Sequence, residues 1–137
     1  MNTLAVPAAV GTSSRAQWTG LVMSGLVVAF LLFDAAIKLV PIAPVTETMA
    51  ALGYPQGLER GLGVLTLVCT LLYAVPRTSV LGAILLTGLF GGAMATHLRV
   101  GSPLFSHLLF GLYLGLLMWG GLYLRDGRLR ALIPFRT

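Results

Sequence analysis

Four long apolar stretches, separated by short polar breaks, dominate the pattern of the chain. They cover residues 17–40, 56–75, 79–96 and 103–124. Each approaches the roughly 20 helical residues that cross a bilayer core, and each exceeds the roughly 9–11 residues of a membrane barrel strand. None shows the strict alternation of a half-buried strand. The pattern therefore predicts an all-α integral membrane protein, a four-helix bundle whose short connections give an antiparallel up-down topology.

Prolines mark where these helices end or begin. Pro41 follows the first stretch and Pro76 follows the second, because proline cannot continue the hydrogen-bond ladder of a helix. Ser102 and Pro103 predict the N-cap and the first residue of the fourth helix. Between the first two stretches, residues 45–52 are typical of a short amphipathic segment.

The composition supports this class of protein. Of the 137 residues, 57% are hydrophobic and 9% are charged, whereas a soluble domain carries about 25% charged residues. This small number of charged residues cannot cover the surface of a soluble domain of this length. A chain with such a large apolar fraction does not stay disordered either. A soluble enzyme and a disordered chain are both excluded.

Arginine is concentrated at one end of the predicted bundle. Four antiparallel helices place on one membrane side Arg15, Arg77, Arg125, Arg128, Arg130 and Arg136. Cytoplasmic loops are rich in Arg and Lys, so both termini are predicted in the cytoplasm and the protein in the cell inner membrane. Residues 1–16 and 126–137 are predicted as a flexible N-terminal tail and a basic C-terminal tail. The net charge of +5 does not indicate nucleic-acid binding, because the basic residues are not interleaved with exposed aromatics.

The opposite end of the bundle gathers the candidate functional residues. The same topology brings together there Asp34, Lys38, Glu59, Arg60, His97, Arg99 and His107. Ionisable groups within spans are costly, and they usually face a bundle interior or a wet cavity. This end is therefore the predicted site.

Each of these residues has a structural and a functional interpretation. Asp34 and Lys38 are four residues apart, so they form either an ion pair that fixes the helix end or a charged wall of a cavity. Glu59 is either a solvated helix start or an inward proton carrier. His97 titrates near neutral pH and could relay a proton or contact a ligand carbonyl. The candidate catalytic residues are thus His97, Glu59 and Asp34.

The candidate ligand-binding residues overlap with these and comprise Lys38, His97, Arg99 and His107. Arg99 also suits a helix C-terminus, where a cation is favourable in any case. No metal site is expected, because the ten-residue gap between the two histidines matches no known ligand spacing. Cys69 is single and falls in the middle of a span, where it is expected to be a small core residue.

Three pairs of glycines have the spacing of close helix contacts: Gly57/Gly61, Gly88/Gly92 and Gly111/Gly115. Such spacing lets two helix backbones approach each other. The spacing does not decide between packing within the bundle and a homo-oligomer interface.

In several short motifs the chain resembles the DoxX-like family of the DoxX/DoxD superfamily of small four-helix membrane proteins. Over about residues 25 to 135 these motifs are Asp34-Ala35-Ala36-Ile37-Lys38-Leu39, Leu52-Gly53-Tyr54-Pro55, Pro76-Arg77, Leu81-Gly82-Ala83, Gly91-Gly92-Ala93, Thr96-His97-Leu98-Arg99, Leu122-Tyr123-Leu124-Arg125, Arg128-Leu129-Arg130 and Pro134. The resemblance implies a four-helix bundle in the cytoplasmic membrane. Relatives include a small subunit of a thiosulfate:quinone oxidoreductase, but the single, deep Cys69 does not favour sulfur oxidation here.

Two functions follow as hypotheses. In the first, the bundle holds a lipophilic ligand, with a quinone as the candidate cofactor, at its outer polar end and within a membrane redox system. In the second, it is a non-catalytic membrane anchor or assembly partner for another protein. The expected partners are the lipid bilayer, a lipophilic small molecule, and a partner membrane subunit or second copy. The sequence does not decide whether the protein is an enzyme.

Overall fold

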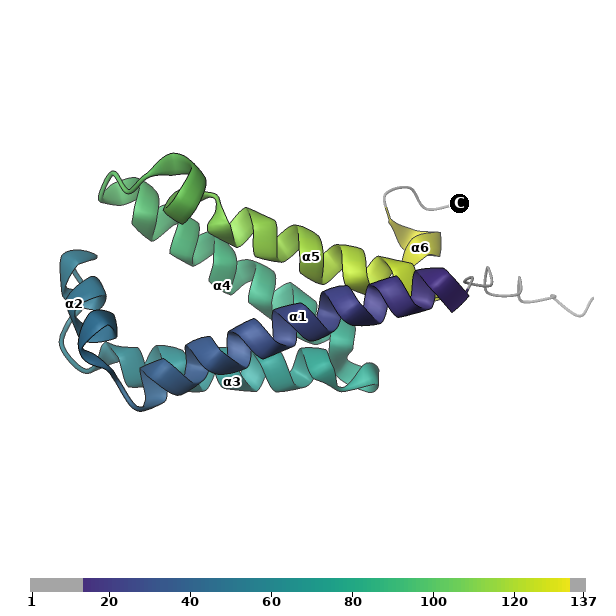
Figure 1. Cartoon of the computed structure of the whole chain (residues 1–137), viewed down its shortest axis with the longest axis horizontal. Helices are drawn as coiled ribbons and strands as arrows, with labels where there is room; N and C mark the ends of the chain where they lie inside the picture. Colours follow the sequence, from purple (N-terminus) through teal and green to yellow (C-terminus); the bar gives the residue numbers. More distant parts are fainter. Residues whose placement is uncertain (1–13, 134–137) are drawn as a thin grey trace, which may run out of the picture.

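The computed structural model describes residues 14–133, which form helices joined by short connections (Figure 1). No strand occurs among these residues. The predicted flexible tail, residues 1–16, lies outside the described part up to residue 13, and so do residues 134–137 of the predicted basic tail. The helices, in chain order, are α1 (Ser14–Leu39), α2 (Ala43–Ala51), α3 (Leu58–Ala74), η1 (Pro76–Thr78), α4 (Ser79–Arg99), η2 (Leu104–Leu108), α5 (Phe110–Arg125) and α6 (Gly127–Leu132).

Three helical segments are long and apolar enough to cross a membrane. They are Ser14–Leu39, Pro76–Arg99 and Leu104–Arg125. The predicted second span corresponds to α3, which has 17 residues and is not among these three segments. The chain is therefore an all-helical membrane protein, as the apolar pattern predicts.

The four long helices contact one another in a cycle. α1 packs against α3 and α5, and α4 packs against the same two helices. The core between them is apolar and contains Val27, Leu31, Cys69, Tyr73, Ala83, Leu86, Phe90, Leu114, Met118 and Leu122. Figure 1 shows that the α1–α3 pair and the α4–α5 pair lie close together at the end near α6 and spread apart toward α2.

The helix backbones approach each other most closely at Gly20 and Gly82, which are not among the glycine pairs identified by their spacing. A Cβ on Gly20 would lie 2.6 Å from the Gly121 carbonyl oxygen, and one on Gly82 would lie 2.2 Å from the Tyr73 nitrogen. Of the three spaced pairs, Gly111 alone meets another helix, at Met94 and Phe90, while the others have open space beside them. Close packing within the chain therefore accounts for Gly111 but not for the other five spaced glycines.

A buried hydrogen-bond chain ties three helices together at the closed end. Arg125 Nε donates to Ser24 Oγ (3.1 Å), Ser24 Oγ lies 2.8 Å from the Tyr73 hydroxyl, and that hydroxyl donates to the Met118 carbonyl (2.8 Å). Tyr73 is fully buried. Because polar groups in an apolar core need partners, this chain fixes how α1, α3 and α5 meet.

Removing the Tyr73 hydroxyl is expected to destabilise the fold. Tyr73→Phe leaves Ser24 without its acceptor and should lower the free energy of unfolding by about 1 kcal/mol, the usual scale of such bonds between membrane helices. Tyr113→Phe is the matched control, since Tyr113 is 41% exposed. Thermal unfolding in detergent measures the difference, and equal midpoints for the two variants would refute the role of the hydroxyl.

Two local features differ from the sequence-based expectation. Ser102 does not cap the fourth long helix; Pro103 occupies the N-cap position of η2, a π-helical turn that precedes α5. The Ser102 hydroxyl instead lies 2.9 Å from His97 Nδ1. Within the predicted basic tail, α6 begins after Asp126, whose carboxylate accepts the Arg128 backbone N–H (2.9 Å). The Ser102 hydroxyl bonds to His97 and is therefore not available as a helix cap. The Asp126 carboxylate is an N-cap, which explains why a helix forms in the predicted tail.

Candidate functional site

A cavity of about 930 Å³ opens between the diverging helices, at the end that carries α2. Side chains from α1, α2, α3, α4 and α5 line it. Most of these side chains are apolar. The polar ones are Asp34, Lys38, Thr48, Tyr54, Thr66, Thr96, His97 and His107. Ligand cavities in proteins have this size and this balance of many apolar walls with few polar groups.

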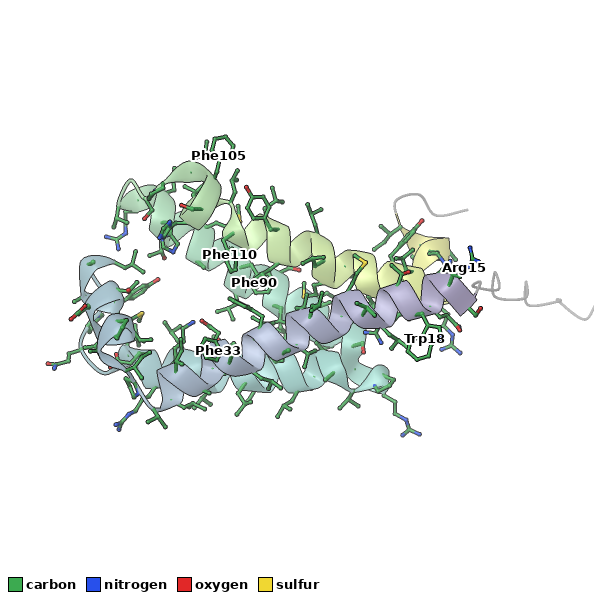
Figure 2. The ribbon with its side chains drawn as sticks, viewed as in Figure 1. Arg15, Trp18, Phe33, Phe90, Phe105 and Phe110 are labelled. Carbon is green, nitrogen blue, oxygen red and sulfur yellow. The ribbon has the colours of Figure 1, made fainter. Side chains whose placement is uncertain are left out.

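Aromatic rings form the inner, apolar part of the cavity. Phe30 of α1 and Phe110 of α5 meet edge to face, with ring centroids 5.2 Å apart. Phe90 of α4 lines the same region, and Figure 2 shows Phe90 and Phe110 lying together beside the space between the helix pairs. Thr66 and Cys69 of α3 lie here too. Both are buried, and the Thr66 hydroxyl is satisfied by the Leu62 carbonyl (2.8 Å). This part of the cavity suits an apolar ring or chain.

An ion pair stands on the α1 wall. Lys38 Nζ lies 2.6 Å from Asp34 Oδ2, and each of the two side chains is about one quarter exposed. The i,i+4 spacing predicted this contact, and both residues line the cavity. The ion pair therefore lies at the cavity wall, near the end of α1.

Two histidine rings meet edge to face, one from the last turn of α4 and one from η2. The ring centroids of His97 and His107 are 5.7 Å apart, and both rings line the cavity. Each Nδ1 is held by a serine hydroxyl, His97 by Ser102 (2.9 Å) and His107 by Ser106 (2.7 Å). Nε2 is thus the nitrogen of each ring that remains for a ligand, as donor or acceptor according to the tautomer. The π-helical turn η2 carries His107, and such turns are frequent at functional sites.

Helix α2 and the turn after it form one wall of the cavity. The Tyr54 hydroxyl lies 2.6 Å from Thr96 Oγ1, and the Arg99 guanidinium donates to the Leu52 carbonyl at the end of α2. Thr48 and Met49 of α2 line the cavity. These two contacts hold the segment against α4, at the end of α4 where His97 lies.

The structure gathers some of the predicted site residues and separates others. Asp34, Lys38, His97 and His107 share one cavity. Glu59 is 6% exposed but does not line the cavity, and its carboxylate accepts the Gly57 backbone N–H (3.1 Å). Arg99 does not line the cavity either, since its guanidinium holds Leu52. Glu59 is thus placed as a helix-start residue and Arg99 as a clamp on α2.

Sequence reasoning did not single out Tyr54, Thr96 or the α2 residues. The amphipathic pattern of residues 45–52 and the motif Leu52-Gly53-Tyr54-Pro55 marked the segment, but nothing in the spacing showed that it folds back over the cavity. Contact between residues 42 positions apart, as for Tyr54 and Thr96, is invisible in a local pattern. Among residues 14–133 no group of three or more His, Cys, Asp and Glu side chains is arranged to hold a metal ion.

These features define a class: an all-helical membrane protein with an apolar cavity that carries charged and imidazole groups at one end. The chain belongs to the DoxX-like family, whose family model matches residues 22–121. The resemblance seen in the sequence motifs is thereby confirmed. Comparisons with curated proteins and with solved structures found no match.

Proposed function

We propose that this DoxX-like protein binds a lipophilic ligand of the quinone type in the cavity between its helices. The observation that carries the proposal is the cavity of about 930 Å³, apolar within and lined at one end by Asp34, Lys38, His97 and His107. A quinone has the matching chemistry, with an isoprenoid chain for apolar walls and ring carbonyls that accept hydrogen bonds. Lys38 and a histidine Nε2–H are donors for such carbonyls.

The proposal includes a membrane arrangement. All four long helices, α3 included, cross the inner membrane as an antiparallel bundle, with both termini in the cytoplasm and the cavity toward the outer side. The positions of Arg15, Arg77, Arg125, Arg128 and Arg130 support this orientation. Helix α3 is within the range of about 17–25 residues that span a bilayer.

A redox role follows as part of the same proposal. Reduction of a quinone to the quinol takes up electrons and protons in equal number. A partner redox protein supplies the electrons, because residues 14–133 offer no redox cysteine pair. His97 passes one proton to each of the two ring oxygens and is reprotonated from water after each transfer, so that two protons accompany the two electrons. Asp34 and Lys38 are the ionisable pair that lines the same cavity. Glu59 lies outside the cavity and takes no direct part.

Native mass spectrometry of the gently purified protein, with extraction of bound small molecules, tests the binding. We expect a stoichiometric lipophile on the wild-type chain. Lys38→Met and His97→Ala should each lower its occupancy about tenfold, the scale of one lost hydrogen bond in an apolar site. Arg60→Met is the matched control for Lys38→Met, because Arg60 is exposed and does not line the cavity. Because Lys38→Met also leaves the Asp34 carboxylate without its ammonium partner, Asp34→Asn/Lys38→Met separates charge imbalance from loss of the donor.

The same spectrum addresses the other candidate function. A chain that carries bulk phospholipid alone would contradict ligand binding. A stoichiometric partner subunit, recovered without a lipophile, would favour the function of a membrane anchor or assembly partner. Unchanged occupancy in both Lys38→Met and His97→Ala would place the ligand elsewhere.

A further inference from the structure

A second, smaller cavity lies at the opposite end of the helices. Its volume is about 370 Å³, and it is lined by Gln17, Leu21, Pro76, Ser79, Leu122, Arg125 and Asp126. These residues come from α1, the α3–α4 connection and the end of α5. The cavity is thus built between helices at the arginine-rich end and is separate from the proposed quinone site.

Arg125 is the cation of this cavity, and it is held in place. Its Nε donates to Ser24 Oγ (3.1 Å), and its guanidinium carbon lies 5.7 Å from the centre of the Tyr73 ring. The hydrogen bond that this side chain donates to Ser24 uses Nε, not the two terminal nitrogens at the end of the guanidinium. A guanidinium presents its donors as a rigid fork that matches the oxygens of a phosphate. Arg125 is therefore pre-oriented for an anion.

The electrostatic surroundings favour a negative ligand. Arg15, Arg77, Arg128 and Arg130 lie at the same end of the described chain, where Asp126 is the acidic residue. Asp126 also lines the cavity, but its Oδ1 already accepts the Arg128 backbone N–H (2.9 Å). The positive charge of the arginines at this end therefore exceeds the single negative charge of Asp126.

The depth of the cavity points to a lipid headgroup. Trp18 follows Gln17 on α1, is 69% exposed, and lies with Arg15 at this end in Figure 2. Exposed tryptophans at helix ends sit at the level of the headgroups. Leu21 lines the cavity and is half-exposed, so acyl chains have an apolar surface directly beside it. Basic pockets between membrane helices are known to bind anionic headgroups.

We infer that this cavity binds the phosphate of an anionic phospholipid, with Arg125 as the contact residue. The inference does not rest on the proposed quinone function, because the two cavities share no lining residue. Its ligand chemistry is a phosphate, which a lipid headgroup or free inorganic phosphate could supply.

The full-length protein in nanodiscs of palmitoyl-oleoyl phosphatidylcholine with a minor fraction of phosphatidylglycerol tests the inference. Native mass spectrometry counts the phosphatidylglycerol retained after release into detergent. We expect one tightly held molecule on the wild type and on Arg128→Gln, an exposed control with the same loss of charge, and about tenfold lower occupancy on Arg125→Gln. Equal retention by Arg125→Gln and Arg128→Gln would overturn the inference.

A second pair of variants guards against misfolding, since Arg125 also anchors Ser24. Leu21→Trp fills the cavity while it leaves Arg125 and its partners in place, and Val22→Trp is the neighbour on α1 that does not line it. Loss of phosphatidylglycerol from Leu21→Trp but not from Val22→Trp supports the site, and equal retention refutes it. Inorganic phosphate is titrated against the bound lipid. Lack of displacement at millimolar phosphate supports the lipid source, and displacement refutes it in favour of free phosphate.

Discussion

Gly82→Ala is expected to cause the largest loss of stability of any single added methyl group in this protein. The new Cβ would lie 2.2 Å from the Tyr73 nitrogen, 2.6 Å from its Cα and 2.8 Å from the Leu72 carbonyl carbon. All three are backbone atoms of α3, so no side-chain rotation can relieve the overlap. Helices α3 and α4 would have to move apart, at a cost of about 1–3 kcal/mol for an overpacked core.

The connection between α3 and α4 has little room to adjust. The Ser79 hydroxyl donates to the Tyr73 carbonyl (2.7 Å), and the Thr78 hydroxyl donates to the Leu72 carbonyl (2.6 Å). Both bonds pull the start of α4 against the end of α3. Separation of the helices therefore stretches these bonds as well as the apolar contacts.

Gly91→Ala is the control, because it lies on the same helix with open space beside it. Alanine is the better helix former by about 1 kcal/mol, so this variant should unfold at the same temperature or higher. Thermal unfolding in one detergent, followed by circular dichroism, compares the two variants. A Gly82→Ala protein as stable as Gly91→Ala would show that α3 and α4 do not approach as described.

Ala93→Trp is expected to weaken binding of the lipophilic ligand strongly and to leave the fold intact. Ala93 lines the large cavity, and its side chain is exposed to that space. An indole ring there occupies volume that the ligand needs but displaces no core side chain. We expect the occupancy of the lipophile to fall by at least about tenfold, which corresponds to roughly 1.4 kcal/mol of binding free energy.

Ala95→Trp provides the comparison, since Ala95 is exposed on the same helix and does not line the cavity. It should keep the ligand at the wild-type level. Extraction and quantification of bound lipophile from both purified variants measure the effect. Equal ligand content in the two variants would contradict the assignment of the site, whereas loss in both would point to a general effect of added bulk on α4.

The sequence by itself determined that the chain is a helical membrane protein and where most of its long helices begin and end. These properties are local. Apolar length sets a membrane helix, and proline interrupts it. The contact between Asp34 and Lys38 was predictable for the same reason, because i,i+4 neighbours meet on any helix.

Only the tertiary structure decided which face of each helix meets another. In a membrane protein the lipid-facing and the core-facing sides are both apolar, so the hydrophobic pattern carries little information on helix rotation. That rotation turns Glu59 and Arg99 away from the cavity, brings His97 and His107 into it, and leaves most of the spaced glycines without a partner helix. The spread of the helix pairs toward α2, which creates the cavity, arises from contacts between distant segments and has no local signal in the chain.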